Sequence, residues 1–158
     1  MQSNNVNRNM LDDVNRWILA ELVENPRIAM SALGRIVEMS APAVTERVQR
    51  LEQTGVITGY TVTLDPEALG YSVTAFTRIK PTPGQVPKII QIVETIPEIS
   101  ECHRITGEDC FLMKIHAHSI QDIERVLDQV ALFGQTVTSI VQSSPVPPRA
   151  LPILARSG

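Results

Sequence analysis

Residues 39–57, which read MSAPAVTERVQRLEQTGVI, decide the fold of the N-terminal part of the chain. Ser40 is a favourable helix N-cap, and Pro42 lies in the first turn, where its missing N–H costs nothing. Gly55 is expected to end the helix. Three apolar residues recur at helical spacing and form its inner face: Val44, Val48 and Leu51. The stretch therefore predicts a helix that is buried on one side only.

The outer face of this helix is polar and carries Pro42, Thr45, Glu46, Gln49 and Arg50. A solvated surface is the simplest interpretation, since most surface helices are amphipathic. Arginine can also contact DNA phosphates, while hydroxyl, carboxyl and amide groups can reach base edges. Arg47 lies at the margin of the apolar face, so it fits either a phosphate contact or an ion pair with an acidic neighbour.

Two further helices are expected before this one. Asp12 can cap the first, which Asn25-Pro26 ends, and its apolar residues are Leu11, Val14, Ile18 and Leu22. The second is expected around residues 30–37, with Leu33, Ile36 and Val37 inside, and a tight turn at Glu38-Met39 follows. Residues 56–64 then alternate around Thr58-Gly59, which predicts a β-hairpin. The order predicts a winged helix-turn-helix, whose third helix lies in the DNA major groove.

The second half of the chain has a different periodicity. Strands are expected at 72–80, 100–106, 110–118 and 136–146, and helices at 86–96 and 119–132. The order βαββαβ predicts a ferredoxin-like domain with both helices on one face of an antiparallel sheet. The open face would be covered by a second copy. The fold class is thus α+β, with domains at 1–60 and 73–146, a linker at 61–72 and a Pro-rich tail at 147–158.

Composition limits the classes of function. The chain has 158 residues, 43% hydrophobic and 20% charged, which indicates a folded protein. No apolar run is long enough for a membrane span, and the N-terminus lacks an apolar signal-peptide core, which points to the cytoplasm. The net charge is −3, and residues 1–60 contain six basic and seven acidic side chains. Any DNA binding must therefore come from a local surface rather than from bulk charge.

Several motifs, in this order and spacing, give a family resemblance. They are S-x-x-x-V-x-x-R-V-x-x-L at 40–51, L-E-x-x-G-V-I-x-G-Y at 51–60, L-D-P-x-x-L-G at 64–70 and T-G-E-D-C at 106–110. From about Leu11 to Val146 the chain resembles the Lrp/AsnC, or feast/famine, transcription regulators. The resemblance implies a dimer that often assembles to an octamer or larger, binds promoter double-stranded DNA, and responds to a small effector, commonly an amino acid. No cofactor is implied.

The resemblance also implies where these ligands bind. The DNA-binding set is Ser40, Pro42, Thr45, Glu46, Arg47, Gln49 and Arg50. The effector set is Thr106, Gly107, Glu108, Asp109 and Cys110, with Thr136, Thr138 and Ser139 opposite. Cys110 stands where many members have aspartate. Because a cysteine does not hold an ammonium group as a carboxylate does, that role is expected to pass to Glu108 or Asp109.

Departures from the family pattern also occur in the helix-turn-helix, at Asn15, Ala29 and Glu38. Ala29 gives its helix no side-chain cap, and a left-handed Glu38 would cost about 1 kcal/mol.

Two other functions are open. Siroheme decarboxylases share this two-part architecture and use histidines and arginines, of which the chain offers His103, Arg104, His116 and His118. A metal site would need the three histidines adjacent across paired strands. The third possibility is a sensing or assembly partner whose helix-turn-helix does not bind DNA. Neither catalytic nor metal-binding residues are assigned.

Overall fold

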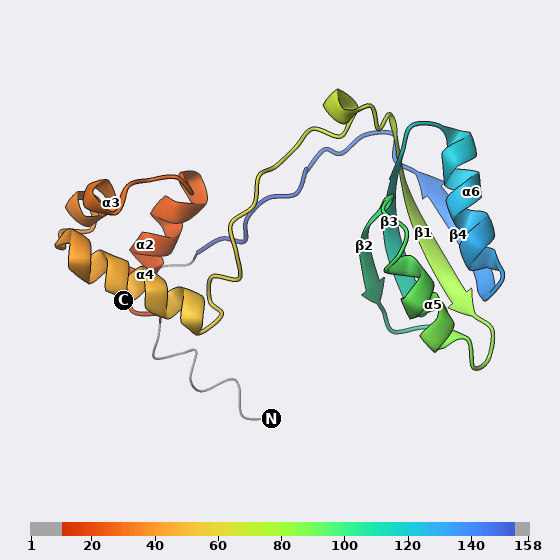
Figure 1. Cartoon of the computed structure of the whole chain (residues 1–158), viewed down its shortest axis with the longest axis horizontal. Coiled ribbons are helices and arrows are strands. Elements are labelled where there is room, and N and C mark those ends of the chain that lie inside the picture. Colours follow the sequence, from red (N-terminus) through yellow and green to blue (C-terminus); the bar gives the residue numbers. More distant parts are fainter. Residues whose placement is uncertain (1–10, 154–158) are drawn as a thin grey trace. The chain divides into compact units, whose positions relative to one another are not determined.

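The structure is a computed structural model that describes residues 11–153. The expectations for the N-terminal signal region, residues 1–10, and for the end of the tail, residues 154–158, lie outside the described residues. The chain divides into two compact units, and the boundaries between them along the sequence fall after Val62 and after Pro147. Each unit is described by itself (Figure 1). The domain limits at 60, 72 and 146 stay a prediction, because a division by contacts does not show which parts fold independently.

Three helices form the first unit: α2 (Asp13–Glu24), α3 (Met30–Ile36) and α4 (Ala41–Gln53). Both expected caps are confirmed. The Asn15 amide donates to Asp12 Oδ1 at 2.7 Å, and the Ala43 amide donates to Ser40 Oγ at 3.4 Å. The core consists of Ile18, Leu22, Leu33, Val37, Val44, Val48 and Leu51.

The expectation for one core residue of the first unit is wrong. Ile36 is 37% exposed, whereas the sequence placed it inside. Leu33 and Val37, four positions apart, already fill the inward stripe of this short helix, so Ile36 lies at its margin. The neighbouring expectation for Ala29 is confirmed, because the start of α3 has no side-chain cap.

The turn between α3 and α4 is tight, as expected, and sets the direction of α4. Glu38 has a φ of 57°, the left-handed conformation that disfavours a non-glycine residue. The Met39 amide donates to the Gly34 carbonyl at 2.8 Å. A Cβ on Gly34 would lie 2.6 Å from the Met39 carbonyl oxygen, so only glycine fits there without a shift.

The expected hairpin after α4 is wrong: no strand is present between Gln53 and Val73 in the described chain. A two-residue type I′ hairpin turn needs positive φ at both central residues, and neither Thr58 nor Gly59 has it. Tyr60 and Val62 do alternate with polar residues, but they are 51% and 79% exposed rather than packed. The helix-turn-helix is confirmed without a wing.

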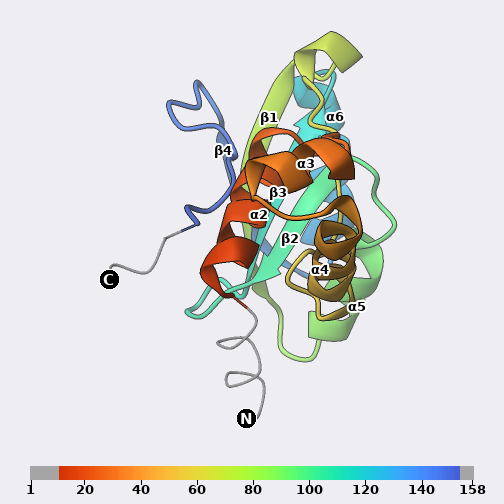
Figure 2. The same ribbon diagram turned by 90° about the vertical axis from the view of Figure 1, so that its left-hand side faces the viewer.

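The second unit follows the predicted order. A 3₁₀ turn, η1 (Glu67–Leu69), leads into β1 (Val73–Pro81), α5 (Val86–Val93), β2 (Ile99–Arg104), β3 (Phe111–Ala117), α6 (Ile120–Ala131) and β4 (Gly134–Ile140). The sheet is antiparallel with strand order β2-β3-β1-β4. Both helices cover the same face, as Figure 2 shows. The ferredoxin-like expectation is confirmed.

Strand register assigns side chains to the two faces of the sheet. Ala75, Thr77 and Ile79 point to the helices and are fully buried. The open face carries Thr74, Phe76, Arg78 and Lys80 on β1, Glu101 and His103 on β2, Leu112, Lys114 and His116 on β3, and Val137 and Ser139 on β4. Among the described helices, none is long and apolar enough to cross a membrane.

Candidate functional site

Helix α4 presents most of the residues predicted to contact DNA. Pro42, Glu46, Gln49 and Arg50 are exposed, and Thr45 is half-buried. The Thr45 hydroxyl donates to the Ala41 carbonyl at 2.8 Å, which leaves its oxygen lone pairs as acceptors. Ser40, also exposed, caps the helix, so the first backbone N–H groups of α4 lie beside the polar side chains. The arrangement offers donors, acceptors and a partial positive charge at one helix end.

Arg47 is half-buried, and contacts within the first unit hold its guanidinium. Its Nη1 donates to Asp12 Oδ2 at 2.7 Å and to Asn15 Oδ1 at 2.9 Å. Asn15 is 7% exposed, and Asp12 also caps α2. The ion pair with an acidic neighbour, one of the two roles open to Arg47 in the sequence, is formed with Asp12, while the phosphate contact stays a prediction. This ion pair joins the middle of α4 to the start of α2.

The same contact also affects the pKa of the Asp12 carboxyl. Partial burial alone would raise that pKa, but the hydrogen bonds from Arg47 and the Asn15 amide, with the Arg47 charge, lower it below its usual 3.8. Beside this pair lies a hollow of about 370 Å³ between the start of α2 and α4, lined also by Met39, Glu46 and Arg50. The middle of α4 is therefore held to the start of α2 beside a concave polar surface.

Arg50 is different, because its partner is weakly held. Its Nη2 lies 3.2 Å from Glu46 Oε1 one turn earlier, and the two side chains are 63% and 74% exposed. Such a pair contributes only about 0.3–0.5 kcal/mol, so a phosphate could replace Glu46. Arg35 on α3, which the sequence expectations did not include, is exposed and has no ion pair among the described residues. Its position in the last turn of an HTH helix makes it a further candidate for a phosphate contact.

The turn predicted to bind an effector joins β2 to β3. Lys80 Nζ contacts Glu108 Oε2 at 2.8 Å, and Arg78 Nε lies 3.8 Å from Asp109 Oδ2. The hydrogen bond and the opposite charges of Lys80 and Glu108 raise the pKa of Lys80 and lower that of Glu108. Gly107 has a φ of 115°, which a residue with a side chain rarely adopts. Both acidic groups expected to hold an ammonium thus already face β1 cations.

The opposite half of the predicted effector site does not converge on this turn within one chain. Thr136 pairs with Ile79, which pairs in turn with Phe111, so β1 separates it from the turn. The Thr138 hydroxyl shares a 2.8 Å hydrogen bond with the buried Thr77 hydroxyl on the helix side. Ser139 lies on the open face. Cys110 is half-buried and packs against the sheet core, and its thiol donates to the Glu108 carbonyl at 3.9 Å.

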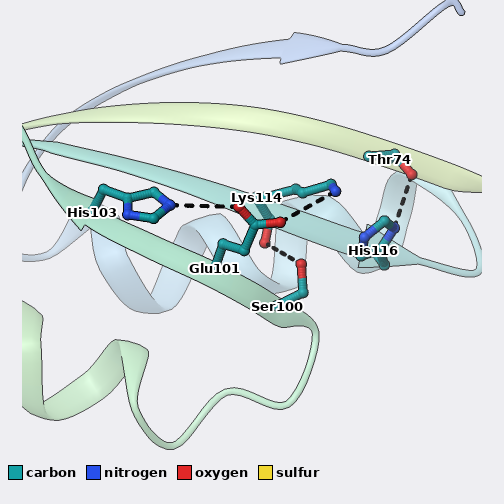
Figure 3. A network of polar contacts seen from close by, with 6 residues as sticks. All are labelled: Thr74, Ser100, Glu101, His103, Lys114 and His116. Carbon is teal, nitrogen blue, oxygen red and sulfur yellow. Dashed lines mark hydrogen bonds and ion pairs between the residues drawn. The ribbon is translucent and has the colours of Figure 1, made fainter. Parts of the chain in front are cut away.

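The histidines are not brought together. His103 stands opposite Leu112, His116 stands opposite Thr74, and the two lie at opposite ends of the network in Figure 3. Between them, Glu101 contacts His103 at 3.4 Å and Lys114 at 3.3 Å. His118 follows β3 and stacks on Tyr71. Arg104 lies over the Phe111 ring. Across residues 11–153, no group of three or more metal-ligating side chains is close enough to hold an ion.

Comparison with known proteins agrees with both units. Residues 11–52 match the AsnC-type helix-turn-helix domain, and residues 74–151 match the Lrp/AsnC ligand binding domain. The chain is 34% identical over 133 residues to the HTH-type transcriptional regulator LrpC of Bacillus subtilis, an alignment that covers 84% of this chain and 92% of LrpC.

Solved structures of related proteins have the same fold over most of this chain. The structure of B. subtilis LrpC has a TM-score of 0.81 at 34% identity, covering 85% of this chain and 96% of LrpC. A feast or famine regulatory protein from M. tuberculosis complexed with L-methionine has a TM-score of 0.83 at 30% identity, covering 89% and 98%. With the fold, both domain matches and these relatives in agreement, the chain belongs to the Lrp/AsnC family of HTH-type transcriptional regulators.

Proposed function

We propose that α4 reads promoter DNA and that the two arginines of this helix have separate tasks. The carrying observation is the contrast between Arg47, held by Asp12 and Asn15, and Arg50, exposed in a weak pair. Arg50 contacts a phosphate, and Arg47 fixes the angle of α4. Arg35 supplies a second phosphate contact from α3, the helix that crosses the backbone in this motif.

The remaining exposed groups of α4 select bases. Glu46 can accept from cytosine, Gln49 can make a paired contact with adenine, and Pro42 and the Thr45 methyl suit the thymine methyl group. Ser40 keeps the first amides of α4 aimed at a phosphate. In a dimer, two such helices enter successive major grooves about one helical turn apart.

The test is a titration of labelled DNA from upstream of the protein's own gene, at two salt concentrations, with and without a pool of amino acids. Tight binding that weakens with salt and shifts with the pool is expected. Binding that never exceeds the level on unrelated DNA would refute DNA reading and favour a sensing or assembly partner. That alternative is supported by the near-neutral charge of α4, in which both arginines are paired.

The effector proposed for the Thr106–Cys110 turn is an amino acid. The L-methionine complex of the M. tuberculosis relative supports this chemistry. An amino acid can exchange with the ion pairs already present: its carboxylate takes Arg78 or Lys80, and its ammonium takes Asp109 or Glu108. Because Thr136 and Thr138 lie on the helix side of the sheet, whereas Arg78 and Lys80 contact the turn on the open face, a neighbouring dimer is proposed to complete the site.

A dimer is proposed to form through the open face of the sheet. Phe76 and Val137 are 39% and 52% exposed on this face. The half-buried Leu112 lies on the same face, across Arg78 from Val137. Phe76→Asp should convert the dimer to a monomer in light scattering, while Thr74→Asp, at the start of β1, should not. Octamers should appear or dissociate when methionine is added, and the protein is proposed to act in the cytoplasm.

Siroheme decarboxylation is less favoured, because His103, Arg104 and His116 lie on different faces or ends of the sheet.

A further inference from the structure

The start of α2 lies on the same side of the helical unit as the surface proposed to read DNA. The hollow of about 370 Å³ in this unit is lined by Glu46 and Arg50 of that surface and by Asp12 and Asn15 at the start of α2. Side chains from both helices therefore border one concavity. The chain that precedes α2 thus joins the unit beside the proposed DNA-reading surface.

Hydrogen bonds fix this point of attachment. Asp12 Oδ2 accepts a hydrogen bond from Arg47 of α4 at 2.7 Å. The Leu11 carbonyl accepts a hydrogen bond from Arg16 Nε at 3.1 Å. Because Leu11 and Asp12 are both held, residues 1–10 are attached at a defined place next to α4.

Residues 1–10, which read MQSNNVNRNM, differ in charge from the helices that follow them. They contain Arg8 and no acidic residue, whereas residues 11–60 contain five basic and seven acidic side chains. Positive charge in excess is therefore found in residues 1–10 and not in the rest of the DNA-reading half, which suits contact with a polyanion. A solvated terminus is the ordinary case for such a segment, but its attachment beside the reading surface favours a role in binding.

The uncharged side chains of this segment suit the edges of base pairs. Four asparagines, one glutamine and one serine can each donate and accept hydrogen bonds. In the minor groove, A·T pairs present only the acceptors adenine N3 and thymine O2, whereas G·C pairs add the guanine amino donor. Narrow A·T minor grooves also have an enhanced negative potential that attracts arginine. The composition thus favours an A·T minor groove.

The length of the segment is sufficient for this contact. Ten extended residues span at most about 33–36 Å. One turn of the duplex is about 34–36 Å long, so the minor groove next to an occupied major groove is roughly 17 Å away. Arg8 stands three positions before Leu11, so about 10 Å of extended chain and its own long side chain are available to reach that groove. N-terminal arms of homeodomains bind the minor groove beside a helix in the major groove in the same way.

We propose that residues 1–10 bind the DNA minor groove adjacent to the major groove that α4 occupies. Arg8 enters an A·T-rich groove, and Asn7 and Asn9 donate hydrogen bonds to adenine N3 and thymine O2. This inference rests on the proposed reading of DNA by α4. It adds a second groove and a preference for A·T pairs outside the base pairs that α4 contacts.

Titration of the full-length protein against two forms of the same upstream DNA tests the proposal. In the second form adenine is replaced by 2,6-diaminopurine, which adds an amino group to the minor groove and leaves the major-groove edge unchanged. The protein should bind the diaminopurine DNA about fivefold or more weakly, as expected for one good base contact. Arg8→Ala should bind both forms alike and lower the slope of log affinity against log salt by about one.

Two further variants serve as controls. Arg125→Ala removes the same charge from α6 in the other unit, so it should keep the full preference for adenine DNA. Arg50→Ala should weaken binding to both forms and also keep that preference, which separates the two grooves. Arg8→Lys keeps the charge and should restore the salt slope that Arg8→Ala loses.

Three results would overturn the minor-groove contact: equal binding of both DNA forms by the unchanged protein, a preference that persists in Arg8→Ala, or tighter binding by Arg8→Ala. If Arg50→Ala loses one unit of salt slope while Arg8→Ala loses none, the reading of DNA by α4 stands and residues 1–10 have no part in it. If the unchanged protein binds no DNA above the level on unrelated DNA, both proposals are refuted.

Discussion

Polar contacts are used differently in the two units of the chain. In the helical unit, the Asp12–Arg47–Asn15 contact includes a buried amide and ties α4 to α2. In the sheet unit, the pairs Lys80–Glu108 and Arg78–Asp109 lie at the surface, where water and ligands can replace either partner. The first arrangement fixes a geometry, and the second can be rearranged. This difference suits a protein that must present one helix reproducibly and also respond to a small molecule.

The largest expected effect comes from filling the closest approach in the helical unit. Gly34→Ala should lower the free energy of unfolding by about 1–3 kcal/mol, because the new Cβ would overlap the Met39 carbonyl. Urea unfolding followed by circular dichroism measures this. Gly59→Ala is the control, since nothing lies within 4 Å of its Cβ position and its φ is not positive. Equal stability of the two variants would contradict the described turn.

Removing Arg47 should cost less, about 1 kcal/mol, because it leaves Asn15 and Asp12 without their charged partner. Arg50→Ala should change stability by less than about 0.5 kcal/mol, since its pair is exposed. Thermal unfolding of both variants measures the contrast. If Arg50→Ala were the more destabilising of the two, the assignment of a structural role to Arg47 would be wrong.

The Asp12 contact also has a predicted pH dependence. Because the folded-state pKa of Asp12 is lowered, its contribution to stability is complete above the usual value of 3.8 and is lost as pH falls below it. Unfolding measured between pH 6 and pH 3 should show this loss. Asp12→Asn should abolish that part of the pH dependence while retaining an N-cap.

In the sheet unit, the pH dependence should appear at a higher pH. The folded-state pKa of His116 lies below its usual 6.5, so the unfolded chain binds the proton more tightly. Stability is therefore expected to fall as pH decreases through and below 6.5. Unfolding of His116→Gln over pH 7.5 to 5 should show a smaller decrease. An identical pH profile in the variant would show that His116 does not titrate in this way.

The smallest structural effect is expected at the effector turn. Lys80→Ala should leave the unfolding temperature nearly unchanged, because the ion pair between Lys80 and Glu108 lies at the surface and contributes little to stability. It should still reduce the response of DNA binding to added methionine. Anisotropy titrations with and without methionine measure that response, and a full response in the variant would remove Lys80 from the effector site.

Local signals in the sequence predicted much of the helical unit. Ser40 and Asp12 cap their helices as expected, and Val44, Val48 and Leu51 are buried together, because caps and helical periodicity depend on near neighbours. The hairpin at 56–64 failed for the opposite reason. Alternation at Tyr60 and Val62 is a strand signal only where a partner strand and a covering face exist, and neither is present in the described chain.

Contacts between distant residues were beyond the sequence pattern. Arg47 and Asn15 are 32 positions apart, so their pairing depends on how α2 crosses α4. The separation of His103 from His116 depends on strand register, which alternation alone does not fix. The sequence also did not show that Lys80 and Arg78 of β1 would form ion pairs with Glu108 and Asp109, although a turn between the two strands was expected.

The most direct test of the central claim is the salt dependence of DNA binding for Arg50→Ala, compared with Gln49→Ala. Arg50→Ala should weaken binding to every DNA sequence and reduce the slope of log affinity against log salt by about one, as expected for one lost phosphate contact. Gln49→Ala should keep the slope and lose preference at particular base pairs. Equal, sequence-independent losses in both variants, or an unchanged slope in Arg50→Ala, would contradict the division of tasks along α4.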